Sequence, residues 1–307
     1  MRKVICFALL LIAPGFAQSA DKRPKITGID HVDFYTTSPE ANREFYTRTL
    51  GLASALPIEP RQTQRYMVGN QFVGYSPAPD PHGRNRMDHV AFNTSNSAAL
   101  RAYLIGKGIA TADGYEIAGT SSRTFFVKDP EGQVIEFVQR SKPIVGGGLT
   151  AGSAGGIKGE AISRHMIHAG IIVHDRAAED HFYRDILGFH LYWQGGMTGD
   201  KTDWVAMQVP DGTDWLEYML NVEPKADQHT TGVMNHISLG VRDIKEAQAE
   251  LESHGWKPHG NEKAQMGRDG KWQLNLYDPD FTRIELMEFK PVEKPCCSEF
   301  QGQHPTE

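Results

Sequence analysis

Short runs of β-branched and aromatic residues, in which apolar and polar positions alternate, predict strands along most of the chain. In the run 88–93, Val90 and Phe92 point to one face of the expected strand, and His89 points to the other. Glu136 and Glu285 are each flanked by apolar residues of the opposite face. We therefore expect the apolar faces to pack in the core and the faces with His and Glu to line the concave side of a sheet.

The pattern repeats within the chain. His31 opens a strand-like run and is followed 14 residues later by Phe45, and His168 is followed by Phe182 at the same distance. A further strand-like run opens the second part of each half, at 87–92 and at 234–239. An Asp-Pro turn, at 129–130 or 278–279, then precedes a closing strand, at 134–139 or 283–289. The chain thus divides into four units of strand, helix and three strands, two in each half.

The expected domains are residues 26–142 and 161–291, joined by a glycine-rich linker at 143–160. The polar tail 292–307 is predicted to be disordered. It holds Cys296 and Cys297, whose Cα atoms lie about 3.8 Å apart as neighbours, so a bond between them would be strained and no disulfide framework is expected.

Residues 1–20 have the pattern of a signal peptide: Arg2 and Lys3 precede ten apolar residues and then small residues. Ten apolar residues are too few to span a bilayer, so no stable membrane insertion is expected after cleavage. The sequence therefore predicts an exported protein, periplasmic or secreted. The formal net charge of −6 argues against a nucleic-acid partner.

Metal-ligand residue types recur in the same order in both halves. His31, His89 and Glu136 are separated by 58 and 47 residues, and the second set by 68 and 49. That second set is His168, His236 and Glu285. Two imidazoles and one carboxylate can bind a divalent metal and leave positions open for a substrate. Zn, Ni, Co, Mn and Fe(II) all suit these ligands, and the sequence does not choose among them.

The repeat resembles the vicinal oxygen chelate superfamily, which includes glyoxalase I, methylmalonyl-CoA epimerase, extradiol dioxygenases and bleomycin-resistance proteins. The resemblance covers roughly 26–140 and 164–290 and rests on the repeated His, on 182–189 and on the Asp-Pro turn before Glu136. It implies an α+β, glyoxalase-like fold: two tandem domains, each of paired βαβββ units that form a curved mixed sheet around a cavity.

In the second half the resemblance extends to bacterial glyoxalase I. Glu217 follows His168 by 49 residues and precedes His236 by 19, which completes a four-ligand set with Glu285. The resemblance implies that either Glu217 or Glu285 moves a proton of a substrate bound through two neighbouring oxygens. In the first half Gly74 takes the position of Glu217, so a three-ligand set remains, with Glu136 as its carboxylate.

That three-ligand set is similar to the iron set of extradiol dioxygenases, although Phe126 and Asn275 stand where those enzymes carry a tyrosine. Three functions thus stay open. The first is a metal-dependent lyase or isomerase of glyoxalase or epimerase type, the second is an Fe(II) dioxygenase, and the third is a non-catalytic protein that binds a small molecule. The partner expected in each case is a small molecule, and an oligomer is not required because each half completes its own site.

Overall fold

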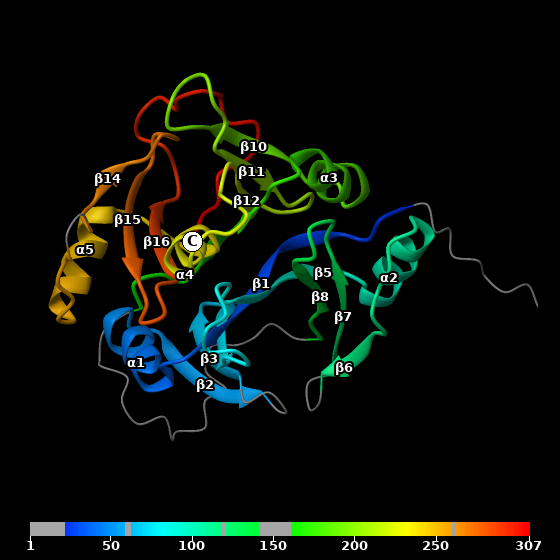
Figure 1. Cartoon of the computed structure of the whole chain (residues 1–307), viewed down its shortest axis with the longest axis horizontal. Coiled ribbons are helices and arrows are strands. Elements are labelled where there is room, and N and C mark those ends of the chain that lie inside the picture. Colours follow the sequence, from blue (N-terminus) through cyan, green and yellow to red (C-terminus); the bar gives the residue numbers. More distant parts are fainter. Residues whose placement is uncertain (1–21, 59–62, 118–120, 142–160, 260–261) are drawn as a thin grey trace, which may run out of the picture.

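The computed structural model describes residues 22–58, 63–117, 121–141, 161–259 and 262–307, which form two eight-stranded sheets (Figure 1). The first sheet and its helices comprise β1 (Ile26–Thr36), α1 (Pro39–Glu44), the π-helical turn η1 (Phe45–Thr49), β2 (Ala53–Ile58), β3 (Thr63–Val68), β4 (Gln71–Pro77), β5 (Met87–Thr94), α2 (Ser97–Gly106), β6 (Tyr115–Ile117), β7 (Ser122–Lys128) and β8 (Val134–Gln139).

The second sheet repeats this order and adds one short helix. Its elements are β9 (Met166–Ile172), α3 (Arg176–Asp180), the π-helical turn η2 (His181–Ile186), β10 (His190–Gly195), β11 (Trp204–Gln208), β12 (Trp215–Met219), α4 (Gln228–Met234), β13 (His236–Val241), α5 (Ile244–Ser253), β14 (Gln265–Met266), β15 (Trp272–Tyr277) and β16 (Arg283–Glu288).

Both sheets have the same mixed topology. The strand order is β2-β3-β4-β1-β5-β8-β7-β6 in the first and β10-β11-β12-β9-β13-β16-β15-β14 in the second. The first strands of two successive units, β1 and β5 or β9 and β13, pair antiparallel in the middle. Each of them also pairs in parallel with the last strand of its own unit. The four predicted units and the α+β, glyoxalase-like fold are therefore confirmed.

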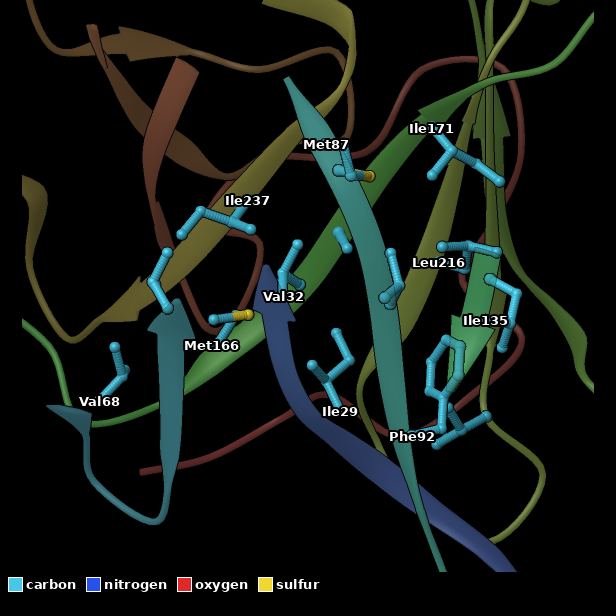
Figure 2. Packing of buried hydrophobic residues seen from close by; sticks show 14 of the residues in the cluster. Ile29, Val32, Val68, Met87, Phe92, Ile135, Met166, Ile171, Leu216 and Ile237 are labelled. Atoms are coloured by element: carbon cyan, nitrogen blue, oxygen red, sulfur yellow. The ribbon is translucent and has the colours of Figure 1, made fainter. Parts of the chain in front are cut away.

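One hydrophobic core joins the two sheets. Figure 2 shows Ile29, Val32 and Met87 of the first sheet packed close to Met166 and Ile237 of the second. These side chains are at most 4% exposed, and full burial of an aliphatic side chain contributes about 1.5–3 kcal/mol. The apolar faces thus pack against the other sheet as well as against the helices, and the opposite faces are left for the predicted ligands.

The two halves exchange buried hydrogen bonds through their Asp-Pro turns. The Tyr183 hydroxyl donates to Asp129 of the first half over 3.1 Å, and the Tyr75 hydroxyl donates to Asp278 of the second half over 2.6 Å. Burial raises the pKa of Asp129 to about 6 and that of Asp278 to about 7. The same kind of contact therefore runs in both directions between the halves.

A second carboxylate in each turn accepts further hydrogen bonds from the other half. Glu131 accepts hydrogen bonds from the backbone N–H groups of His174 and Asp175, just before α3. Asp280 accepts from the backbone N–H and the hydroxyl of Thr37, just before α1. Each closing turn therefore binds the chain that enters the first helix of the other half.

The tail 292–307 is ordered, contrary to the prediction of disorder. Ser298 exchanges two hydrogen bonds of 3.0 Å with the backbone of Gln194, and the Tyr192 hydroxyl lies 2.6 Å from Nδ1 of His304. Cys296 and Cys297 are joined by a disulfide, which the distance argument from the sequence disfavoured. The tail owes its order to these bonds with β10, which composition does not reveal.

The predicted signal peptide and the whole of the predicted glycine-rich linker lie outside the described residues. Within the described part of the chain, no helix is long and apolar enough to cross a membrane.

Candidate metal centres

The first centre lies on the concave face of the first sheet and combines His31 of β1, His89 of β5 and Glu136 of β8. The Nε2 atoms of the two histidines are 3.0 Å apart. Oε2 of Glu136 lies 3.1 Å from His31 Nε2 and 3.0 Å from His89 Nε2. The predicted triad is thus brought together from three neighbouring strands, and all three side chains are buried.

These three donor atoms fit a divalent metal. Around an ion with bonds of about 2.1 Å, adjacent octahedral ligands lie about 3.0 Å apart, which is the spacing observed here. The arrangement is the facial set of two histidines and one carboxylate that leaves the opposite positions open. Phe72 stacks on the His31 ring at 4.3 Å between centroids and fixes its orientation.

Carboxylates behind the histidines hold the rings in place. Nδ1 of His31 lies 2.6 Å from Asp30, which is itself bound by Arg140, and Nδ1 of His89 lies 3.1 Å from Asp88. Strand alternation alone would turn Asp30 away from His31. The pairing of β1 with β5 shifts register between Ile29 and His31, so Asp30 occupies a bulge. Such outer partners set the tautomer and raise the basicity of a metal-binding histidine.

Without a metal, both histidines of the first centre hold a proton. Burial lowers their pKa, but the hydrogen bonds of His31 with Asp30 and Glu136 overcome this effect and raise its pKa to about 9. Asp33 and the hydrogen bond with Asp88 raise the pKa of His89 to about 10 against the same effect of burial. These protons must leave before the nitrogens can bind a metal.

The second centre places His168 of β9, His236 of β13 and Glu285 of β16 together, with Glu217 of β12 beside them. His168 Nε2 lies 3.1 Å from His236 Nε2 and 3.2 Å from Glu285 Oε2. Glu217 Oε2 is farther away, at 3.7 Å from His168 and 3.5 Å from His236. Trp215 packs on the His168 ring at 4.7 Å. All four predicted ligands thus share one site.

Charge is distributed differently around this centre. The Arg283 guanidinium lies 2.8 Å from His236 Nε2, and burial together with this charge holds the pKa of His236 well below 6.5. Burial raises the pKa of Glu217. It would also raise that of Glu285, but the hydrogen bond with His168 and the charge of Arg283 lower it. Among the described residues, His168 Nδ1 has no hydrogen-bond partner, because Ile167 takes the place of Asp30.

A cavity of about 330 Å³ opens beside the second centre. Glu217, Glu285 and Arg283 lie in its wall, and Phe300 brings the tail into it. Three tryptophans also line the cavity: Trp193, Trp204 and Trp215. Cavities that take small molecules have volumes of about 300–1,000 Å³ and combine apolar walls with a few polar groups, as this one does.

The family model of the Glyoxalase/Bleomycin resistance protein/Dioxygenase superfamily matches residues 28–137 and 165–286. The chain belongs to this superfamily. The two matched stretches coincide with the two sheets, so each half of the chain is one copy of the superfamily's domain. No curated protein matches the sequence.

Several solved structures share the fold over most of this chain. The 2,3-dioxygenase LapB from Pseudomonas sp. KL28 is 16% identical, with a TM-score of 0.64 over 93% of this chain and 96% of its own. The halotolerant catechol dioxygenase BphC is 17% identical, with a TM-score of 0.64 over 92% and 95%. Homoprotocatechuate 2,3-dioxygenase from Brevibacterium fuscum (E323L mutant) is 18% identical, with a TM-score of 0.60 over 86% and 72%. At these identities the likeness concerns the fold.

Sequence reasoning missed three groups near the centres. Asp33 lies 4.0 Å from Nε2 of both His31 and His89, and it follows His31 by two residues on the same strand. That i, i+2 spacing is a signal for a shared face. Asp30 was missed because of the bulge. Arg283 stands two residues before Glu285, and the same alternation would have placed it in the site.

Proposed function

We propose that the second centre is the active site of a metal-dependent enzyme that acts on a small substrate bound through two neighbouring oxygens. The observation that carries the proposal is the position of Glu217. It borders the cavity and lies 3.5–3.7 Å from the two histidine nitrogens, farther than the 3.1–3.2 Å contacts among His168, His236 and Glu285.

His168, His236 and Glu285 would hold the cation, which supplies charge stabilisation for two substrate oxygens when bound. Glu217 is then the carboxylate beside the cavity that is not already used to hold the cation. It faces the cavity and can accept a proton from carbon or return one, as general acid–base catalysis needs. This arrangement supports a lyase or isomerase of the glyoxalase or epimerase type.

Arg283 and the aromatic wall narrow the substrate class. The guanidinium lies in the cavity wall beside His236, where it favours an anionic group on the substrate. Trp193, Trp204 and Trp215 present apolar surface of a size that suits a small organic acid. The proposed substrate is therefore a small anion with two vicinal oxygens, such as a hydroxy or oxo acid.

A ring-cleaving dioxygenase is the second candidate. It is favoured by the facial set of two histidines and one carboxylate, which non-haem Fe(II) oxygenases use, and by the two-domain layout shared with LapB and BphC. Asn275 argues against it, because it stands where extradiol enzymes carry a tyrosine. A non-catalytic binding protein of the same fold is the third reading.

The deciding experiment separates proton transfer from oxygen chemistry. The protein, purified without chelator, is analysed for metal and then loaded in turn with Zn, Ni, Co, Mn and Fe(II). Exchange of substrate C–H for deuterium is followed by NMR on a panel of hydroxy and oxo acids under nitrogen, and oxygen uptake is followed with catechols. The proposal expects exchange that is lost in Glu217→Gln and retained in the first-centre variant His31→Ala. Oxygen uptake without exchange would favour the dioxygenase, and tight binding without either reaction would favour a binding protein.

We further propose that the protein is exported, on the strength of residues 1–20. A glutathione hemithioacetal is a cytosolic substrate, so export argues against lactoylglutathione as the product. N-terminal sequencing of the protein from cell fractions tests this: an intact Met1 in the cytosolic fraction would contradict export.

A further inference from the structure

Each centre has one carboxylate at a position where the other centre has a glycine. In the first sheet β1 and β4 pair Asp33 with Gly74, and in the second sheet β9 and β12 pair Gly170 with Glu217. Across the central pair, Asp33 lies opposite His89 and Gly170 lies opposite His236. Asp33 and Gly170 are therefore equivalent positions, and Gly74 and Glu217 are equivalent as well.

We infer that Asp33 is the fourth metal ligand of the first centre and replaces, from the neighbouring strand, the glutamate that β4 lacks. The inference rests on the proposed metal dependence, which it extends to the first centre. The first centre would then hold a divalent cation by two histidines and two carboxylates and leave two of six octahedral positions for other ligands. The additional carboxylate comes from the first strand in one domain and from the fourth strand in the other.

Position supports this role for Asp33. One carboxylate oxygen lies 4.0 Å from His31 Nε2 and the other lies 4.0 Å from His89 Nε2. The ligand atoms of these three residues all lie within 4.8 Å of one another. Asp33 is only 8% exposed, and its Oδ1 has no hydrogen-bond partner among the described residues. A buried carboxylate oxygen without a donor is unfavourable unless a cation balances it.

Gly74 and Gly170 leave space for the side chains that face them. A Cβ atom at Gly74 would lie 2.0 Å from Asp33 Oδ1, so the aspartate fills the space that a β4 side chain would need. At Gly170 a Cβ atom would lie 2.0 Å from Cε1 of His236. The paired carboxylate therefore excludes a side chain at Gly74, and the His236 ring excludes one at Gly170. In the first centre, the pairing of Asp33 with a glycine on β4 is thus a steric requirement.

The test measures Co²⁺ binding at the first centre in a His168→Ala background, which disables the second centre. Affinity comes from calorimetry, and the coordination number comes from the intensity of the visible Co²⁺ absorption bands. Asp33→Asn keeps the shape and removes the charge. Asp113→Asn is the matched control, because it removes one fully exposed carboxylate from the same domain.

A transposed variant moves the carboxylate back to β4. It combines Asp33→Gly with Gly74→Glu, and adds Thr63→Ser because Cγ2 of Thr63 would lie 2.9 Å from the new Cβ. We expect Asp33→Asn to weaken Co²⁺ binding by at least the roughly 10–100-fold that loss of an outer partner causes. The transposed variant should recover most of that loss, and Asp113→Asn should bind like the parent.

Three results would overturn the inference. They are an unchanged affinity and spectrum in Asp33→Asn, a folded transposed variant that binds no better than Asp33→Asn, and a parent whose first centre takes up no Co²⁺. Thermal unfolding of each metal-free variant shows whether it is folded, and the transposed variant decides the matter if Asp33→Asn is not. Failure of the proposed function is seen separately, as loss of metal or activity at the second centre in His31→Ala.

Discussion

The two centres should respond differently to pH when they bind a metal. In the metal-free protein the pKa of His31 is about 9 and that of His89 is about 10, so both rings are protonated at neutral pH. A metal at the first centre must displace both protons. At the second centre the His236 ring is already neutral, because burial and the charge of Arg283 hold its pKa well below 6.5.

The size of the effect follows from the proton count. Release of two protons makes the apparent association constant of the first centre rise about 100-fold per pH unit, or roughly 2.7 kcal/mol, over the range below pH 9. From pH 6 to pH 8 the total is about four orders of magnitude. Since His236 contributes no proton, the apparent association constant of the second centre should rise less steeply with pH.

The assay is calorimetric titration with Zn²⁺ in two buffers of different ionisation enthalpy, from which the number of released protons is obtained directly. It is run on His168→Ala, which retains the first centre, and on His31→Ala, which retains the second. About two protons should be released at pH 7 in His168→Ala and fewer in His31→Ala. Equal proton counts in the two variants, or a count near zero in His168→Ala, would refute the electrostatic reasoning.

Three further changes test the same geometry. Asp30→Asn should weaken metal binding at the first centre about 10–100-fold and leave the second unchanged, because Asp30 orients His31; a competition titration against a coloured chelator measures both affinities, and equal losses at the two centres would contradict the assignment. Gly170→Ala should displace His236 and remove metal from the second centre alone, as elemental analysis per chain would show; full occupancy would mean that the ring has room to move. In the metal-free protein the protonated His31 and His89 stabilise the fold, since their pKa values lie above the ordinary 6.5. That contribution is complete below about pH 6.5 and is lost as pH rises through about 9 and 10, so the free energy of unfolding by urea should fall across this range in the wild type and less in His31→Ala.

The sequence contained enough information for the fold and for the convergence of most of the candidate ligands on two sites. Strand alternation placed His89 and Glu136 opposite the core-facing residues, and the duplicated order of His, His and Glu indicated convergence on one face of each sheet. These features depend on local backbone periodicity, which is readable from one sequence. Glu217 was found only through resemblance to a family, because nothing local distinguishes it from a solvated carboxylate.

What the sequence did not reveal depends on departures from regular pairing and on distant contacts. Asp30 reaches His31 only because β1 is bulged there, and alternation predicts the opposite face. The ordered tail is held by bonds such as those between Ser298 and Gln194, which are 104 residues apart. Polar composition therefore suggested disorder where specific partners exist.

The exchanged Asp-Pro turns give the contact between the halves the form of an isologous interface. Tyr183 binds Asp129 as Tyr75 binds Asp278, so each half offers a donor and an acceptor to the other. A twofold dimer of identical single domains would make the same pair of contacts. The covalent connection between the halves then acts mainly through effective concentration, by converting a bimolecular association into an intramolecular one. It also frees the two copies to diverge, which is how one domain can hold its extra carboxylate on β1 and the other on β12.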